Sequence, residues 1–444
     1  MSDSSIVSSE MTYPETIKYL YSQLPVFQHI GKSAYKEGLD NTLALDKYFG
    51  HPHTKFRSIH VGGTNGKGST SHLLSAILQS AGYKVGLYTS PHLLDFRERI
   101  RVNGKMIDGK YVVDFVANHK AHYEPLRPSF FELTTLMAFT YFEQQEVDFA
   151  IIEVGLGGRL DSTNILSPIL SVITNISLDH TQFLGDTLEK IAFEKAGIIK
   201  PCTPVVIGEA EGEVRKVFEN KASLENARIT FAEDISPIKS FERKNGKYVF
   251  QTVNYSNLIG ELGGFAQVKN ANTVLAAIAE LKKQEIRIPE HAVREGFLTV
   301  TRLTGLMGRW QVIGQHPTIV CDTGHNVGGI QYLVEQLECE SYQKLRIVFG
   351  MVSDKDIASV LAMLPKNAVY YFTKANIARA LDEKELEKQA ETYGLFGKPF
   401  SSIEEAVGKV LEEAADEDFV FIGGSNFVVS EALAALQSKG FQIH

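Results

Sequence analysis

The chain has 444 residues, too many for one ordinary hydrophobic core, so two or three domains are expected. Hydrophobic residues make up 44% of it and charged residues 22%, as in globular proteins, and the formal net charge of −8 gives no basis for non-specific binding to nucleic acid. The three scattered cysteines predict neither a disulfide framework nor a zinc cluster. No apolar run reaches about 18 residues, and the serine-rich N-terminus lacks the apolar region of a signal peptide. We therefore expect a soluble, cytoplasmic protein without membrane contact.

The first predicted elements are two short helices, at residues 12–24 and 40–49, joined by a loop at 26–38 that we place on the surface. A short strand follows and runs into a glycine-rich turn. Beyond the turn a helix is predicted from apolar residues at helical spacing, which are Leu73, Leu74, Ile77 and Leu78. A strand, a glycine-rich turn and a helix in this order form an anion site, because backbone N–H groups and the helix dipole favour negative charge and glycines let phosphate approach closely.

The glycine-rich turn carries side chains suited to a nucleoside triphosphate. Lys67 supplies a mobile cation for the terminal phosphates, and Ser69 or Thr70 offers a hydroxyl to Mg2+. The spacing departs from the common P-loop pattern, since only three residues separate Gly62 from Gly66. A plain turn with three glycines would also account for the motif, but the strand predicted after the helix completes a βαβ unit. We therefore predict a triphosphate site.

Polar side chains follow three predicted strands of this unit. Ser90 follows the strand after the glycine-rich turn, Glu153 lies in the apolar run 149–154, and His180 follows the strand at 170–174. The carboxyl ends of parallel strands form the ligand-binding edge of an open sheet. A carboxylate in a buried strand is costly unless it is paired or binds a cation, although an edge strand facing water would also accommodate it. A histidine in a loop is usually only a polar residue, but beside Glu153 and the turn it becomes a candidate ligand of Mg2+, whose sites are otherwise dominated by oxygen donors.

The rest of the first half alternates further helices with one strand and one hairpin. The strand is at residues 204–207, and a hairpin is predicted where residues 239–241 and 248–253 flank an Asn-Gly turn, as a small antiparallel addition to the first domain. The predicted helices are 111–124, 130–145, 188–198, 211–225, 270–281 and 289–299.

A domain change is expected near two glycines at 305 and 308, which gives a first domain at 1–300, a linker at 301–308 and a second domain at 309–444. The second domain alternates strands and helices, which predicts a parallel, doubly wound sheet. Its strands are predicted at 309–313, 318–322, 345–349, 369–373 and 419–422. Its helices are predicted at 327–338, 355–363, 383–392, 403–415 and 427–437. Polar residues collect at its strand ends and suit one face of a cleft: Asp322, His325, Asn326, Ser353, Asp354, Lys355, Asp356 and Ser425.

These motifs together resemble those of folylpolyglutamate synthases, including the bifunctional dihydrofolate synthases, within the Mur ligase superfamily. The resemblance spans nearly the whole chain, and the glycine motif fits this family better than generic P-loops. It rests on Gly63-Thr64-Asn65-Gly66-Lys67-Gly68-Ser69, Thr89-Ser90-Pro91-His92-Leu93, Glu153-Val154-Gly155-Leu156-Gly157-Gly158, Leu178-Asp179-His180, Glu194-Lys195-Ala196-Gly197-Ile198 and Ser353-Asp354-Lys355-Asp356. It implies an α/β fold: a P-loop Mur-ligase-like ATPase domain with a small antiparallel addition, and a C-terminal Rossmann-like doubly wound domain.

The resemblance implies an ATP-dependent ligase that joins L-glutamate to a folate, and that in bifunctional members also converts dihydropteroate to dihydrofolate. A folate carboxylate attacks the γ-phosphorus of ATP to give an acyl phosphate, and the glutamate amine then attacks the acyl carbon. Because two anions must meet, cations and oriented N–H groups are needed to neutralise charge. Lys67 and Mg2+ would do so at the phosphates.

The resemblance also implies roles for individual residues. Metal ligands would be Ser69, Ser90, Glu153 and His180. ATP would be held by Gly63, Thr64, Asn65, Gly66, Lys67, Gly68, Ser69, Thr70, Asn270, Arg309 and Asp322. Catalytic groups would be Lys67, His180, Lys195, Asp322 and His325. The pterin side would use Phe131, Glu132, Leu160, Asp161 and Ser162.

Several of these residues also have ordinary interpretations. Lys195 matches a lysine that the family carries as a carbamate, which turns a cation into an anionic ligand, but in isolation it is a helix-end lysine. Arg309 reads equally as a surface charge, Asn270 as a helix cap and Phe131 as a core residue. The second-domain motif has Thr323 and Gly324 where the family usually has Gly and Ala.

Two other functions are compatible with these motifs. One is another Mur-type ligase acting on a peptidoglycan precursor, which would need a uridine-nucleotide pocket. The other is a nucleotide-binding module without ligase chemistry, which would not require the polar strand ends of the second domain. The expected partners are small molecules only, with no nucleic acid and no membrane, and a monomer is expected. We also expect the two domains to close around ATP.

Overall fold

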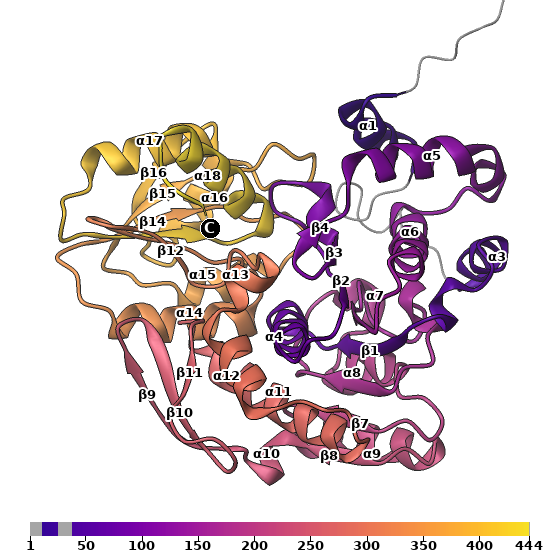
Figure 1. The fold of residues 1–444 in the computed structure, drawn as a ribbon. Coiled ribbons are helices and arrows are strands. Elements are labelled where there is room, and N and C mark those ends of the chain that lie inside the picture. Colours follow the sequence, from indigo (N-terminus) through magenta and orange to yellow (C-terminus); the bar gives the residue numbers. More distant parts are fainter. Residues whose placement is uncertain (1–10, 25–37, 444) are drawn as a thin grey trace, which may run out of the picture.

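The computed structural model describes residues 11–24 and 38–443 (Figure 1). Nearly all of the loop predicted at 26–38 therefore lies outside the described residues. The chain forms two large sheets, one from its first half and one from residues 311–423, with a small third sheet near both. In the described part of the chain, no helix combines the length and the apolar character that a membrane crossing requires.

The first sheet has eight strands in the order β4-β3-β2-β5-β1-β6-β7-β8. Strands β2, β5, β1, β6, β7 and β8 are parallel, whereas β3 and β4 add an antiparallel edge that the sequence analysis did not predict. The strands are β1 (Arg57–Gly62), β2 (Val85–Tyr88), β3 (Ile100–Val102), β4 (Lys105–Met106), β5 (Phe149–Glu153), β6 (Leu170–Ile173), β7 (Val205–Ile207) and β8 (Ile229–Phe231). Because β5 lies in the middle, Glu153 cannot be the water-facing residue of an edge strand.

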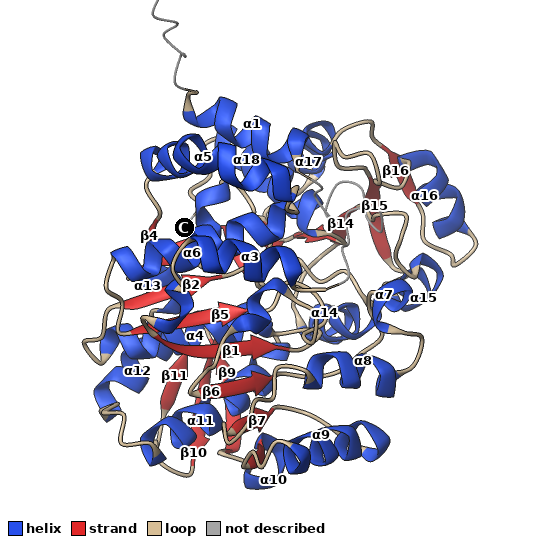
Figure 2. Ribbon diagram, turned by 90° about the vertical axis from the view of Figure 1, so that its right-hand side faces the viewer, coloured by secondary structure: helices blue, strands red, loops and turns tan. Residues whose placement is uncertain are grey.

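Helices cover both faces of this sheet (Figure 2). Successive side chains of β5 enter opposite cores: Ile151 packs with α4, α11 and α12, and Ile152 packs with α5 and α6. The helices of this half are α1 (Tyr13–Gln23), α3 (Asp40–Tyr48), α4 (Lys67–Ser80), α5 (Gly109–Tyr123), α6 (Phe130–Gln144), α7 (Thr181–Leu184), α8 (Leu188–Ala196), α9 (Gly212–Leu224), α10 (Ala232–Ile235), α11 (Ala266–Lys283), α12 (Glu290–Leu298) and α13 (Val300–Thr304), with short 3-10 turns η2 (Pro52–Thr54), η3 (Phe96–Arg99), η4 (Glu124–Leu126) and η5 (Ser162–Ile165).

The predicted hairpin is present and belongs to a three-stranded antiparallel sheet in the order β11-β10-β9. The strands are β9 (Ile238–Lys244), β10 (Lys247–Thr252) and β11 (Leu258–Gly260). Tyr248 and Phe250 are buried in the same core as α4 and α11, so the hairpin is an addition to the first domain, as predicted. The predicted linker contains α13 and two glycines in the left-handed region, Gly305 and Gly308, with φ of 68° and 66°.

The second sheet has six strands in the order β12-β13-β17-β14-β15-β16. Five of its strands form the predicted parallel, doubly wound sheet, whereas β12 adds an antiparallel edge that was not predicted, because it pairs with β13 across a tight turn at Pro317. The strands are β12 (Gln311–Gln315), β13 (Thr318–Cys321), β14 (Leu345–Phe349), β15 (Ala368–Phe372), β16 (Gly397–Pro399) and β17 (Phe419–Gly423). The helices are α14 (Val327–Cys339), α15 (Ile357–Met363), α16 (Glu383–Glu391), α17 (Ile403–Glu413) and α18 (Asn426–Ser438). Helices α14 to α16 pack on one face and α17 and α18 on the other, as in a doubly wound fold.

Candidate active site

The glycine-rich turn joins the end of β1 to the start of α4, and two of its positions require glycine. Gly63 has φ of 133° and Gly66 has φ of 84°, both in the region that L-residues with side chains rarely adopt. A Cβ on Gly66 would overlap the Asn270 side chain, and a Cβ on Gly63 would overlap Thr174. Asn270 therefore lies directly against the turn, where the sequence analysis expected an ATP-binding residue. The turn leads into the N-terminus of a 14-residue helix, which favours an anion.

Lys67, which is half-buried, and Lys195, which is buried, meet at one carbonyl oxygen of the turn. Lys67 Nζ donates to the carbonyl oxygens of Gly63 and Thr64, at 3.1 and 3.0 Å. Lys195 Nζ, from α8, donates to the same Gly63 oxygen at 2.8 Å. Burial lowers the pKa of both lysines, and burial together with the charge of Lys67 lowers the pKa of Lys195 to about 7. The turn thus faces two amines, one of which is half neutral near neutral pH.

Three of the four predicted metal ligands gather around the first turn of α4. The Glu153 carboxylate, 4% exposed, accepts the backbone N–H of Ser90 at 3.1 Å, and burial raises its pKa. A Cβ on Gly68 would lie 3.9 Å from a carboxylate oxygen of Glu153. The neighbouring Ser69 hydroxyl accepts from Gln267 Nε2 at 3.2 Å. The Glu153 carboxylate is an oxygen donor of the kind that a hard divalent cation prefers, whereas the Ser69 hydroxyl is held by Gln267 of α11.

His180, the fourth predicted metal ligand, lines the same cavity as Lys67. It has φ of 51° at the start of α7, and its Nε2 is 3.9 Å from a carboxylate oxygen of Asp179. Burial lowers the pKa of His180 to about 3, so the imidazole is neutral, which is the form that binds metals. His180 and Glu153 line two adjacent cavities, and Ser90 lines both.

The structure has two lobes, the first built on the eight-stranded sheet and the second on the six-stranded sheet. Asp179, which the sequence analysis quoted only as part of a motif, connects them. Its carboxylate accepts from Lys355 Nζ at 2.5 Å and from Asn326 Nδ2 at 2.9 Å, and it lies 3.7 Å from His325 Nε2. Burial alone raises the pKa of Asp179, but His325, His180 and Lys355 outweigh it and hold that pKa well below its ordinary value. Asp179 is therefore a charged residue held between the lobes.

A second contact between the lobes involves the glycine-rich turn. Asn65 and Asn326 exchange two amide hydrogen bonds, at 3.2 and 3.0 Å. His325 Nδ1 is 2.9 Å from the Thr323 carbonyl oxygen, which fixes the ring beside this contact. The glycine-rich turn therefore faces the second lobe, as a shared site requires.

The other two ATP-binding candidates, Arg309 and Asp322, come from the start of the second lobe. Arg309 donates to the Gly308 carbonyl oxygen at 3.1 Å and contacts Thr323, and its guanidinium lies 3.3 Å from the Cβ position of Gly68. Asp322 accepts the backbone N–H groups of Trp310 at 2.6 Å and Gly324 at 2.8 Å, and burial raises its pKa. Arg309 is thus a site residue that reaches the turn.

A cavity of about 250 Å3 opens beside these groups. All five residues predicted for the pterin side line it, which are Phe131, Glu132, Leu160, Asp161 and Ser162. Predicted residues of the turn and the catalytic set also line it, which are Gly63, Thr64, Lys67, Ser90, His180, Lys195 and His325. Gly68, Glu153 and Arg309 line a second cavity of about 40 Å3. Thr70 lines neither of these two cavities, and its hydroxyl is buried in α4 without a hydrogen-bond partner in the described chain.

The two acidic residues predicted for the pterin side have local partners. Glu132 accepts the backbone N–H of Ser129 at 2.5 Å in the capping box of α6, and Asp161 accepts the N–H groups of Leu156 at 2.8 Å and Thr163 at 3.0 Å. The ring of Phe131 packs directly against Gly155, and a Cβ atom on Gly155 would overlap that ring. The sequence analysis did not assign a role to Lys355 and Arg379, which also line the cavity. The polar cluster at residues 353–356 was the available signal for Lys355.

The chain is similar to known proteins over both lobes. Residues 61–279 match the Mur ligase middle domain, and residues 308–426 match the glutamate ligase domain of the Mur ligases. The dihydrofolate synthase/folylpolyglutamate synthase of Bacillus subtilis (strain 168) is 35% identical over 420 residues, which cover 90% of this chain and 95% of the relative. The structure of E. coli FolC in complex with DHPP and ADP matches with a TM-score of 0.84 at 29% identity, covering 97% of this chain and 98% of that one. A bifunctional folylpolyglutamate synthase/dihydrofolate synthase with Mn, AMPPNP and L-glutamate bound matches with a TM-score of 0.80 at 30% identity, covering 96% and 98%.

Proposed function

This chain belongs to the folylpolyglutamate synthase/dihydrofolate synthase family of the Mur ligases, and we propose that it joins L-glutamate to a folate at the expense of ATP. In the proposed reaction a folate carboxylate oxygen bonds to the γ-phosphorus of ATP as the bond to ADP breaks. The glutamate amine then attacks the acyl carbon, loses a proton and displaces phosphate. The relatives' names also support dihydropteroate as a second acceptor, which gives dihydrofolate by the same chemistry.

The observation that carries this proposal is the meeting of both lobes at the glycine-rich turn. The Asn65–Asn326 pair and the Asp179–Lys355 pair place the turn, the buried amines and the second-lobe groups around one cavity. A ligase needs its phosphate donor and two acceptors in one place, because reacting groups must be held within contact distance. A nucleotide-binding module would need only the first lobe.

The residues divide into roles that their positions support. Lys67 would exchange its two carbonyl partners for phosphate oxygens, while Asn270 and Arg309 hold the nucleotide from two sides. Glu153 and Ser69, with Ser90 and His180, would hold Mg2+, which neutralises phosphate charge when bound. Asp322 would orient the backbone at Trp310, whose N–H group it accepts.

We propose that the two substrates enter from opposite walls of the cavity. The pterin ring would stack near Phe131 and Leu160, while Glu132, Asp161 and Ser162 shape that wall through their backbone contacts. The two carboxylates of L-glutamate suit the wall that carries the cations of Lys355 and Arg379, which would exchange their present partners Asp179 and Asp354 for the substrate. We also propose a monomer with a first domain at 1–300, a linker at 301–308 and a second domain at 309–444, a division supported by the start of the six-stranded sheet at Gln311.

Lys195 is proposed to act as a carbamate. Its buried amine would attack CO2, forming an N–C bond and releasing a proton, and the product is an anion beside the proposed metal site. A pKa of about 7 supplies the neutral amine that this step needs. The alternative is an unmodified lysine that only fixes the Gly63 carbonyl.

The test is ADP release by the full chain with ATP, Mg2+, L-glutamate and one acceptor at a time. Tetrahydrofolate should support turnover, and dihydropteroate should do so if the enzyme is bifunctional. A uridine-linked muramyl acceptor is the control, since the rival ligase would use only that. Turnover with the muramyl acceptor alone, or with none of the three, would overturn the proposal.

A further inference from the structure

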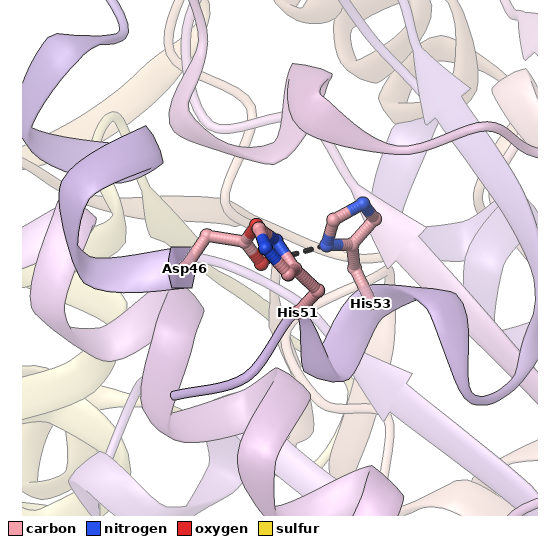
Figure 3. A group of neighbouring side chains, drawn as sticks. All are labelled: Asp46, His51 and His53. Carbon is pink, nitrogen blue, oxygen red and sulfur yellow. Dashed lines mark hydrogen bonds and ion pairs between the residues drawn. The ribbon is translucent and has the colours of Figure 1, made fainter. Parts of the chain in front are cut away.

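A second cluster of metal-ligating side chains lies away from the active site, where α3 ends. It contains Asp46, His51 and His53, whose potential ligand atoms all lie within 4.8 Å of one another (Figure 3). His51 Nδ1 is 2.5 Å from one oxygen of the Asp46 carboxylate, and His53 Nδ1 is 2.7 Å from the other. The proposed catalytic residues do not include any of these three.

The backbone brings the three side chains together. The N–H of Gly50 donates to the Lys47 carbonyl at 3.2 Å, and the N–H of His51 donates to the Asp46 carbonyl at 2.9 Å. These two bonds form a Schellman motif, which places the side chains at Asp46 and His51 side by side. An apolar contact commonly occupies these two positions, but here a carboxylate faces an imidazole. The 3-10 turn η2, which begins with Pro52, then directs His53 onto the same carboxylate.

The negative charge of the Asp46 carboxylate needs a compensating positive charge. Its side chain is only 2% exposed, and among the described residues its ion-pair partners are the two histidines, without a lysine or arginine. A buried carboxylate is costly unless a positive group compensates it. Either protonated histidines or a bound metal ion would do this.

The donor set selects the class of metal. Two imidazole nitrogens and one carboxylate oxygen are typical of Zn2+ and related transition metals, whereas Mg2+ prefers oxygen donors throughout. Ligand atoms about 2.0 to 2.1 Å from a tetrahedral ion lie about 3.3 Å apart. The two hydrogen bonds would therefore lengthen by about 0.6 to 0.8 Å, which small side-chain rotations allow. The exposure of His51, at 55%, leaves an entry path and room for a water ligand.

We propose that Asp46, His51 and His53 form a binding site for a divalent transition metal such as Zn2+. Its role is structural, because the cluster precedes β1 while the glycine-rich turn follows it, and β1 is about 20 Å long at ~3.3 Å per residue. The ion would hold the end of α3 against the 3-10 turn η2, which leads into β1. On binding, the proton of each Nδ1 passes to solvent and each ring, then neutral, carries its remaining proton on Nε2, so that N–metal and O–metal bonds replace the N–H···O hydrogen bonds.

The experiment measures Zn2+ binding by the full chain after treatment with a chelator. Zn2+ is titrated in competition with a chromophoric chelator and in excess Mg2+, which occupies an oxygen-donor site but not this one. One Zn2+ per chain should bind, and His51→Asn and Asp46→Asn should each weaken it at least about tenfold. Zn2+ should raise the Tm of the unmodified protein but not of these variants. His291→Asn, at an exposed histidine of α12, is the matched control and should bind as before.

Two further measurements distinguish metal binding at this cluster from metal binding at the exposed thiols. Co2+ bound in place of Zn2+ should give visible absorption that His53→Asn removes. The double variant Cys202→Ser, Cys339→Ser should retain it, because these exposed thiols are the competing soft ligands. Ligase activity in Mg2+ should not change in His51→Asn, which shows that the variant is folded. Equal Zn2+ binding by the wild type and His51→Asn, or no Zn2+ binding by the wild type in the titration, would mean a hydrogen-bonded triad only and would overturn the proposal.

Discussion

Replacing Lys195 with alanine removes the buried amine that donates to the Gly63 carbonyl oxygen. Burial lowers the pKa of that amine from 10.5 to about 7, with a contribution from the Lys67 charge. At pH 7 an amine of pKa 10.5 is neutral in about 0.03% of molecules, whereas one of pKa about 7 is neutral in about half. The fraction able to attack CO2 therefore increases roughly a thousandfold. If the carbamate is an anionic group of the site, Lys195→Ala should lower kcat at least about a hundredfold.

The assay combines kinetics with direct detection of the carbamate. ADP release is measured for Lys195→Ala with and without acetate or formate, which can occupy the space left by the side chain and restore part of the activity. In 13C-bicarbonate the wild type should show a carbamate carbon signal that the variant lacks. Lys190→Ala is the matched control, because Lys190 is exposed on the same helix and pairs with Asp186 at 2.7 Å.

The direction of the pH dependence follows from the lowered pKa. Below about pH 7 the amine in the folded protein is protonated and cannot react with CO2, so kcat and the carbamate signal should rise together as pH rises through about 7. With an unperturbed lysine the rise would come near pH 10.5. Full activity in Lys195→Ala, or a wild type without a carbamate signal, would refute the reasoning.

The remaining predictions concern three other charged groups. Lys67→Ala should lower kcat by about 10² to 10³ because phosphate charge goes uncompensated, and near-normal kcat would remove Lys67 from the site. Glu153→Gln keeps the shape but loses the charge, so the Mg2+ concentration for half-maximal activity should rise about tenfold or more, and an unchanged Mg2+ titration would contradict a metal role. Lys355→Ala leaves the Asp179 carboxylate buried between the lobes without its ammonium partner, a cost of about 3–5 kcal/mol in the closed arrangement. Small-angle scattering should then show a more open chain, whereas unchanged scattering and activity would mean that this pair does not hold the lobes together.

Local features of the protein could be predicted from the sequence because interactions between residues close in the chain determine them. The glycine-rich turn needs glycine at 63 and 66 because the backbone there has positive φ, and that need is visible in the sequence. The helix beginning after Ser129 follows from a capping box within four residues. The alternation of strands and helices also predicted the doubly wound second lobe. The same reasoning missed the antiparallel edge at β12, because the strands predicted at 309–313 and 318–322 have no helix between them and a two-residue turn at His316 and Pro317 reverses the chain.

The interpretation of individual side chains depended on neighbours far away in the chain. Glu132 and Asp161 are exceptions, because they line the cavity and their carboxylates accept backbone N–H groups only two to five residues away in the chain. Asp179 was part of a quoted motif, yet its importance as a link between lobes is visible only beside Lys355, which is 176 residues away.

The sequence by itself determined the glycine-rich turn and the polar strand ends, because these depend on residues adjacent in the chain, and the resemblance of its motifs to a known family indicated the class of chemistry. Only the tertiary structure decided which charges meet. The pKa of Lys195 is set by burial and by Lys67, and the position of Asn326 beside Asn65 is set by how two sheets pack. Burial and long-range electrostatic contacts are properties of the folded whole, and no spacing along the chain encodes them directly.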